Sequence, residues 1–365
     1  MGIIELFKYM ISCKSETPSD GGLLDFITNY LPDFTAVRVD VGGVKNLFLY
    51  KKFADGDHLC FAGHVDVVPA GSGWNSNPYE ALEKDGYIYG RGTQDMKSGV
   101  AAFVEAIKEV QTFRGTLSIL LTSDEEGEAT HGTIKVLEYL QEHNMLPDYA
   151  VVAEPTCEQK FGDAIKVGRR GSINGYVTIK GKQGHAAYPE KAINPIDLIA
   201  PRLAHIAGVD IDEGDEHFAP SKCVITDIRA GMQVTNVTPN ELQMMFNVRN
   251  TTKTTQKEVR SFIARHLAGL DFDLRLTQGS YPFITDASSK VVRNIGHAIE
   301  KVSGVKPKHS TAGGTSDARF MAPMGIKVIE FGVKNDTIHS INERTTAAEV
   351  EGLYKVFKHM IEEWK

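Results

Sequence analysis

The chain has 365 residues, of which 42% are hydrophobic and 24% are charged, and its formal net charge is −7. This length exceeds that of an ordinary single domain, so we expect two domains, and the balanced composition argues against large-scale disorder. The acidic balance disfavours a nucleic-acid partner, and no apolar run of about 18 residues predicts a membrane span.

Strands and helices alternate in the first half of the chain. The expected helices cover residues 5–31, with a break near Thr17-Pro18-Ser19, and residues 100–110. The expected strands are 36–41 and 46–50, which form a hairpin, and the short apolar runs 59–63, 117–121 and 149–153. This alternation predicts an α/β fold with a layered core.

The middle of the chain follows a different order, which predicts an inserted domain. Its expected elements are strands 174–180, 224–229, 242–249 and 272–277 and helices 195–206 and 255–270. Their order, β-α-β-β-α-β, is that of a ferredoxin-like domain. The α/β pattern then returns with a helix at 288–302, a strand at 327–331 and a C-terminal helix whose apolar stripe ends at Trp364. We therefore expect residues 172–283 to be inserted into a larger domain formed by residues 1–171 and 284–365.

The cysteines and the N-terminus bear on the compartment. Four widely spaced cysteines form no C-x-x-C pair, so we expect reduced thiols and no thiolate zinc site. Residues 1–8 carry charges where a signal peptide needs an unbroken apolar core. These features predict a cytoplasmic protein.

Polar residues follow the expected core strands, where the loops of α/β folds converge on ligands. His64 and Asp66 follow strand 59–63, and their spacing puts them on one side of an extended chain. A metal-bound histidine commonly donates its second ring N–H to a carboxylate, so the pair fits a metal site; a strand-end histidine beside a surface aspartate is the alternative. Asp95 ends a glycine-rich loop before an apolar helix, where it is a site residue or a helix N-cap.

Further carboxylates and a second histidine follow later core strands. Asp124, Glu125 and Glu126 repel one another, and either solvent or a cation has to offset that repulsion. Glu154 directly follows the next strand, and His339 follows the last one, although a single such histidine is more often structural. As a set, these residues suit a divalent cation such as Zn²⁺, with one carboxylate as a ligand and its neighbour as a general base.

These clusters, in this order, resemble those of the zinc-dependent amidohydrolases and exopeptidases, a group that includes acetylornithine deacetylase, aminoacylase and related carboxypeptidases. The resemblance covers essentially the whole chain. It implies a mixed-sheet catalytic domain, an inserted dimerisation domain, a homodimer formed through that domain, and two Zn²⁺ ions per subunit that Co²⁺ can replace. The metal ligands that it implies are His64, Asp95, Glu126, Glu154 and His339.

The same resemblance implies roles for the residues around the metals. Asp95 bridges both ions and is followed by a cis peptide bond, and Asp66 supports His64. Glu125 is the general base. His185 stabilises the oxyanion, often in the active site of the partner subunit.

Residues 168–172 and 310–320 further resemble the desuccinylase branch of this group. The implied reaction is hydrolysis of N-succinyl-LL-2,6-diaminoheptanedioate to succinate and LL-2,6-diaminoheptanedioate, in lysine and diaminopimelate biosynthesis. Arginines and glycine-rich loops suit such a substrate, because guanidinium and backbone N–H groups bind carboxylates. Gln94 and Thr235 depart from the pattern, where a small residue and an asparagine are common. The implied substrate contacts are Arg169, Ser172, Tyr188, Asn236, Arg249, Gly314 and Thr315.

Other functions fit parts of the sequence. The same chemistry could act on acetylornithine, another N-acyl amino acid or a dipeptide. A non-enzymatic metal-binding or peptide-binding protein would be expected to lack the base Glu125. Residues 314–318 come close to the G-x-S-x-G pattern of serine hydrolases, with Ser316 as the nucleophile. A nicotinamide-dependent dehydrogenase is disfavoured, because no G-x-G-x-x-G follows the first strand.

Overall fold

The computed structural model describes residues 1–364, and the chain divides into two compact units. The first unit comprises Met1–Gly168, Thr285–Ser310 and the residues from Ser316 to the C-terminus, and the second comprises Arg169–Ile284 and Thr311–Thr315. The predicted inserted domain lies within the second unit. The short segment Thr311–Thr315 also belongs to that unit, although it is distant in sequence and was expected in the larger domain.

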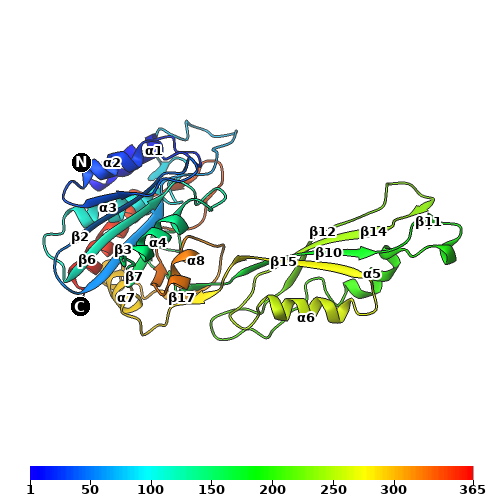
Figure 1. Cartoon of the computed structure of the whole chain (residues 1–365). Coiled ribbons are helices and arrows are strands. Elements are labelled where there is room, and N and C mark those ends of the chain that lie inside the picture. The colour runs from blue at the N-terminus through cyan, green and yellow to red at the C-terminus, as the bar shows by residue number, and fades with distance from the viewer. Residues whose placement is uncertain (365) are drawn as a thin grey trace. The chain divides into compact units, whose positions relative to one another are not determined.

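An eight-stranded mixed sheet forms the centre of the first unit (Figure 1), with the order β1-β2-β6-β3-β7-β18-β8-β17. The neighbours β6, β3, β7 and β18 are parallel, whereas β1 and β2 form an antiparallel hairpin, as predicted. The central strands are buried on both faces, which explains their continuous apolar runs. The strands are β1 Thr35–Arg38, β2 Asn46–Lys52, β3 Asp57–His64, β6 Gly115–Thr122, β7 Tyr149–Val152, β8 Ala164–Lys166, β17 Lys308–Ser310 and β18 Lys327–Glu330. A separate three-stranded sheet contains β4 Leu82–Lys84, β5 Tyr87–Tyr89 and β19 Arg344–Thr345.

Helices pack on this sheet, and α3 is buried along almost its whole length. It contacts β3 as well as α1 and α9, so it is covered from several sides, and most of its buried residues are apolar or small, apart from Lys97 and Glu105. The helix predicted for residues 5–31, with a break near Thr17-Pro18-Ser19, is two helices separated by residues 13–22, and α4 was not predicted. Trp364 is buried but lies beyond the end of α9. The helices are α1 Ile3–Ser12, α2 Leu23–Tyr30, α3 Lys97–Lys108, α4 Thr133–Glu142, α7 Lys290–Ser303, α8 Ala318–Met321 and α9 Ala347–Glu362, with a 3₁₀ turn at Ala322–Met324.

The second unit has a four-stranded antiparallel sheet of order β12-β14-β10-β15 and two helices, which confirms the predicted β-α-β-β-α-β arrangement. Every second residue of β10 and β14 is buried, because one face of the sheet packs on α5 and α6. α6 begins with the predicted Thr255 cap, which forms a capping box with Glu258. The elements are β10 Ser172–Lys180, β11 Gly184–His185, a 3₁₀ turn at Pro189–Lys191, α5 Pro195–Leu203, β12 Cys223–Ala230, β13 Val237–Thr238, β14 Glu241–Val248, α6 Gln256–His266 and β15 Phe272–Ser280. Two short strands, β9 Gly168–Arg169 and β16 Phe283–Ile284, pair with each other where the chain passes between the units.

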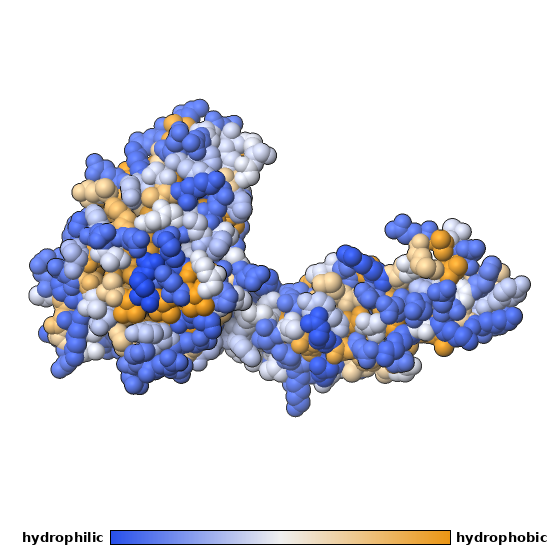
Figure 2. All heavy atoms as spheres, turned by 45° about the horizontal axis from the view of Figure 1, so that its top comes forward, coloured by the Kyte–Doolittle hydropathy of each residue, from blue (hydrophilic) through white to orange (hydrophobic). Residues whose placement is uncertain are grey.

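Hydrophilic residues cover most of the surface in Figure 2, with scattered hydrophobic patches on both units. In the second unit, the exposed hydrophobic residues include Tyr188, Met232 and Val234. Within residues 1–364, no helix combines the length and the apolar character needed to cross a membrane.

Candidate metal centre and substrate residues

The parallel strands at the centre of the sheet bring the predicted site residues of the first unit to one edge. Since β6, β3, β7 and β18 are adjacent and parallel, the loops after them meet at the same sheet edge. Each of these strands is followed by at least one predicted residue, and the loop before α3 adds Asp95. The residues gathered here are His64, Asp66, Asp95, Glu125, Glu126, Glu154 and His339.

Asp95 lies between the two histidines. Its Oδ1 is 3.0 Å from His64 Nε2, and its Oδ2 is 3.3 Å from His339 Nε2. Glu154 Oε1 is 3.8 Å from the same nitrogen of His64, and Glu126 Oε1 is 2.9 Å from that of His339. The donors thus form two groups that share one carboxylate. His64, Asp95 and Glu126 each offer one ligand atom, and these three atoms lie within 4.8 Å of one another, which is close enough to hold a cation.

Asp95 does not cap helix α3, so the alternative explanation that it is a helix N-cap is wrong. The N-cap residue of α3 is Met96, and no side chain caps this helix end. The Asp95–Met96 peptide bond is cis, as the resemblance implied. Asp95 is therefore available to the two histidines that it contacts.

Asp66 supports the site in a way that differs in part from the prediction. The Nδ1–H of His64 donates to the main-chain oxygen of Asp66 at 2.8 Å, whereas the nearer carboxylate oxygen is 3.6 Å away. The Asp66 carboxylate instead accepts hydrogen bonds from the main-chain N–H groups of Glu125 and Glu126, at 3.4 and 3.1 Å. The prediction assumed that the chain is extended as far as Asp66, but β3 ends at His64, so the two side chains need not lie on one side. These contacts leave His64 Nε2 facing Asp95 and fix the loop that follows β6.

The electrostatics of this cluster favour a bound cation. Burial, reinforced by the charges of Asp317, Asp95 and Glu126, raises the pKa of Glu125 to about 8. Hydrogen bonds to Asp95 and Glu126 raise the pKa of His339 to about 10. Without a cation, therefore, protons offset the excess of carboxylates. Divalent cations do the same, and imidazole nitrogens and carboxylate oxygens are the donors that Zn²⁺ takes.

The predicted residues of the second unit form two groups. Ser172 begins β10, and Arg249 follows Val248 of β14, which pairs with Ile173, so Ser172 and Arg249 lie at the same end of the sheet. Arg169 is at this end as well and donates to the main-chain oxygen of Ala312 at 3.0 Å, in the segment that also contains Gly314 and Thr315. We call Arg169, Ser172, Arg249, Gly314 and Thr315 the base group.

The other group lies beyond the opposite end of β10 and contains His185, Tyr188 and Asn236. The rings of His185 and Tyr188 are 5.8 Å apart, and the main-chain oxygen of Asn236 accepts a hydrogen bond from Ala186. We call these three residues the tip group. Because β10 has nine residues, the two groups are separated by about 30 Å at about 3.3 Å per residue. One small substrate therefore cannot contact both groups of the same chain.

Sequence reasoning missed two buried residues beside the metal centre and the contacts of a third. Arg91 and Glu343 form a buried ion pair with 2.7 Å between Nη1 and Oε2. Gln94 was noticed only as a departure from the family pattern, yet its side chain is buried and fully hydrogen-bonded. A buried charge next to a glycine-rich loop is hard to find from one sequence, because its partner is about 250 residues away.

Ser316 does not have the surroundings of a serine nucleophile. Its side chain is 1% exposed, and its Oγ donates to the carboxylate of Glu330. A nucleophilic serine needs a base at its hydroxyl and access to substrate. The serine hydrolase alternative is therefore disfavoured.

Comparisons with known proteins agree with this fold. The family model described as peptidase family M20/M25/M40 matches residues 60–363. Succinyl-diaminopimelate desuccinylase of Sulfurimonas denitrificans is 76% identical over 365 residues, which cover 100% of both chains. The enzyme of the same name from a Nitratiruptor species is 65% identical over 99% of both.

Solved structures show the same fold. The aminopeptidase PepT of Bacillus cereus has a TM-score of 0.82 at 24% identity, over 99% of this chain and 97% of its own. A Bacillus subtilis protein, described as a dinuclear metal-binding peptidase of the M20 family, has a TM-score of 0.72 at 15% identity, over 98% and 96% of the two chains. Family match, full-length relatives and fold agree, and this chain belongs to peptidase family M20/M25/M40.

Proposed function

We propose that this protein hydrolyses the amide bond of N-succinyl-LL-2,6-diaminoheptanedioate, releasing succinate and LL-2,6-diaminoheptanedioate for lysine and diaminopimelate biosynthesis. The observation that carries this proposal is the 76% identity to a desuccinylase over the full length of both chains. The cluster of carboxylates and imidazoles at the sheet edge supports it, since this donor set suits metal-dependent amide hydrolysis.

Two Zn²⁺ ions, which Co²⁺ can replace, are the proposed cofactors. His64, Asp95 and Glu154 would hold one ion, and Asp95, Glu126 and His339 the other. This assignment is supported by the two oxygens of Asp95, which face different histidines. When bound, the ions lower the pKa of water and polarise the amide carbonyl.

Glu125 is the proposed general base and, later, the general acid. Its carboxylate accepts a proton from the attacking water and then delivers that proton to the nitrogen of the leaving amine. Burial, which raises the pKa of Glu125 to about 8 in the absence of metal ions, supports this role, because proton transfer in both directions is efficient when the pKa is near the working pH. Cations beside Asp95 and Glu126 would favour its ionised form. Asp66 is proposed to act indirectly, because it orients the ring of His64 and the loop that carries Glu125.

The base group is proposed to bind the substrate carboxylates. Arg169 and Arg249 offer guanidinium groups, and Ser172, Gly314 and Thr315 offer hydroxyl or main-chain donors. The tip group is proposed to act across a homodimer formed through the second unit, with His185 stabilising the oxyanion and Tyr188 and Asn236 contacting substrate in the partner's active site. The separation of about 30 Å along β10 supports this proposal, since the tip group cannot reach the substrate that its own base group binds.

A cytoplasmic location is also part of the proposal, since a precursor of lysine is made inside the cell. The free thiols Cys13, Cys60, Cys157 and Cys223 fit a reducing compartment.

The test is succinate release from the proposed substrate by the full chain, after chelation and again after zinc is restored. Activity that disappears and returns is expected. Values of kcat/KM for acetylornithine and for dipeptides, measured beside it, report which acyl group the pocket prefers. Zinc-loaded protein that releases no succinate but cleaves one of these substrates would refute the assignment and favour a deacetylase or dipeptidase.

A further inference from the structure

The loop that carries His339 has an unusual backbone. His339 has a φ of 56° and Asn342 a φ of 58°, in the left-handed region that few residues other than glycine adopt. Such a conformation persists only where neighbouring groups hold it. His64 is different, because it ends a strand of the central sheet, and Glu154 lies two residues beyond the end of the strand next to it. The position of His339 therefore depends on the contacts of its loop.

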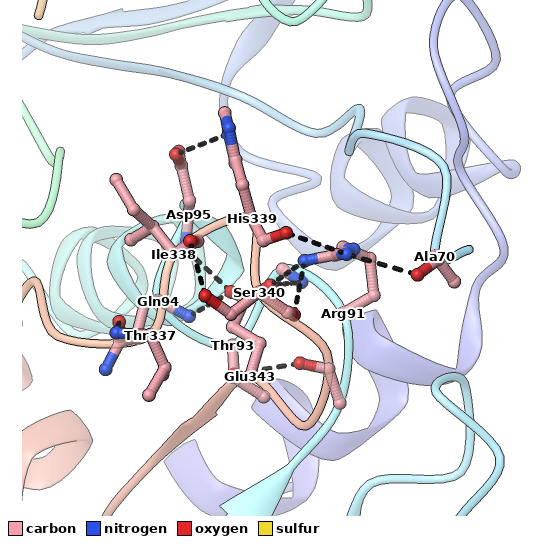
Figure 3. Close-up of polar contacts among 12 residues, drawn as sticks. Ala70, Arg91, Thr93, Gln94, Asp95, Thr337, Ile338, His339, Ser340 and Glu343 are labelled. Carbon is pink, nitrogen blue, oxygen red and sulfur yellow. Dashed lines mark hydrogen bonds and ion pairs between the residues drawn. The ribbon is translucent and has the colours of Figure 1, made fainter. Parts of the chain in front are cut away.

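The side chain of Gln94 makes three of these contacts, and Figure 3 shows Gln94 beside Asp95 and the loop of His339. Its amide group donates to the Asp336 carboxylate and, at 2.8 Å, to the main-chain oxygen of Arg344. Its Oε1 accepts from the main-chain N–H of Thr337 at 2.9 Å. Both amide hydrogens and the amide oxygen are used, and the side chain is only 2% exposed. Gln94 thus holds the loop on both sides of His339.

Gln94 also immediately precedes Asp95 in the chain, and the carboxylate of Asp95 is shared by the two proposed metal positions. The Glu343 carboxylate holds the main chain of both residues in place, because it accepts hydrogen bonds from the N–H groups of Gln94 and Asp95 at 2.8 and 3.3 Å. Arg91 pairs with Glu343 and donates to the main-chain oxygen of Ser340 at 3.3 Å. The loops of Asp95 and His339 are therefore joined by hydrogen bonds that run in both directions.

We propose that Gln94 is a positioning residue that fixes His339 relative to Asp95 and thereby sets the affinity of the metal position formed by Asp95, Glu126 and His339. This inference rests on the proposed function, since it assumes two metal positions. The position formed by His64, Asp95 and Glu154 depends less on Gln94, because its other two ligands are held by the central sheet and by Asp66. Loss of the Gln94 side chain should therefore affect the two positions unequally.

The experiment measures zinc binding to the metal-free full chain in competition with a chromogenic chelator, which yields one dissociation constant per position. In Gln94→Ala, one constant should stay within about twofold of the wild-type value and the other should weaken by about 10–100-fold, the usual effect of removing a group that orients a ligand. Gln94→Glu should weaken the same position, because a carboxylate cannot donate to Asp336 or to the Arg344 carbonyl. Asp336→Asn should bind zinc like wild type, since its amide oxygen can still accept from Gln94.

Asn46→Ala is the matched control. Asn46 is another fully buried amide in the same unit, and it donates to the main-chain oxygens of Val39 and His131, neither of which is a proposed ligand. It should lower stability without changing either zinc constant. Two unchanged constants in Gln94→Ala, or an equal loss at both positions, would overturn the inference. If Gln94→Ala does not fold, Asp336→Ala decides the question. Asp336 is an exposed hydrogen-bond partner of Gln94, and its loss should weaken zinc binding at the same position only.

This outcome can be told apart from failure of the proposed function. Wild-type protein that binds two zinc ions but releases no succinate would refute the function and leave the role of Gln94 intact. Active wild-type protein together with unchanged zinc binding in Gln94→Ala would refute only the role of Gln94.

Discussion

Replacing the proposed base by its amide, Glu125→Gln, tests the chemistry most directly. The substitution preserves the size of the side chain, and the main-chain N–H of residue 125 can still donate to Asp66. The loop that carries Glu126 should therefore keep its position. Glutamine cannot accept a proton from water, so the expected change is a loss of turnover without a loss of metal.

The size of the effect follows from the surroundings of Glu125. General bases contribute about 10²–10⁴-fold to rate, and the contribution is largest when their pKa is near the working pH. Because burial raises the pKa of Glu125 and bound cations would lower it again, we expect its working pKa to lie nearer neutrality than that of an exposed glutamate, and a loss of about 10³–10⁴-fold in kcat. This corresponds to about 4–5.5 kcal/mol of activation free energy.

The assay measures succinate release at saturating substrate, with the zinc content determined on the same sample. Glu128→Gln is the control, since Glu128 lies in the same loop but is exposed. It should retain wild-type turnover. A kcat for Glu125→Gln within tenfold of wild type, at full zinc content, would refute the general-base role.

Four further predictions concern metal, stability and assembly. Chelation should abolish succinate release and raise the susceptibility of the apo-protein to heat, because several carboxylates then lose their compensating charge; an unchanged Tm would contradict this. Glu343→Ala should lower the free energy of unfolding, measured in urea, by about 3–5 kcal/mol, because it leaves Arg91 as a buried unpaired charge; a loss below about 1 kcal/mol would contradict the ion pair. Burial lowers the pKa of His58 from 6.5 to about 4, so the unfolded chain takes up the proton first as the pH falls. About 3 kcal/mol of stability, present above pH 6.5, should be lost towards pH 4, and His58→Gln should flatten that part of the profile. Mixing inactive His185→Ala and Arg169→Ala chains should restore about a quarter of wild-type activity, because half of the dimers then contain one intact site of two; no recovery after subunit exchange would contradict action across the dimer.

The sequence predicted most of the elements that build the site. The apolar runs before His64, Glu125 and Glu154 form buried parallel strands, and the polar residues that follow them converge because parallel strands end at one sheet edge. Local patterns of this kind are readable because burial on both faces of a strand requires an unbroken apolar run. The alternating strands and the Thr255 cap of the second unit were readable for the same reason.

Two features could not be read from the sequence. The joined loops around Gln94 depend on hydrogen bonds between residues about 240–250 positions apart, and nothing in either local sequence indicates its partner. The grouping of Arg249 with Ser172 follows from the register of β10 with β14, which only the folded sheet defines. The sequence by itself thus predicted which residues carry the chemistry, and it determined which strands present them. Tertiary packing alone decided how firmly each ligand is held and which residues one substrate can reach, because both depend on contacts between segments that are distant along the chain.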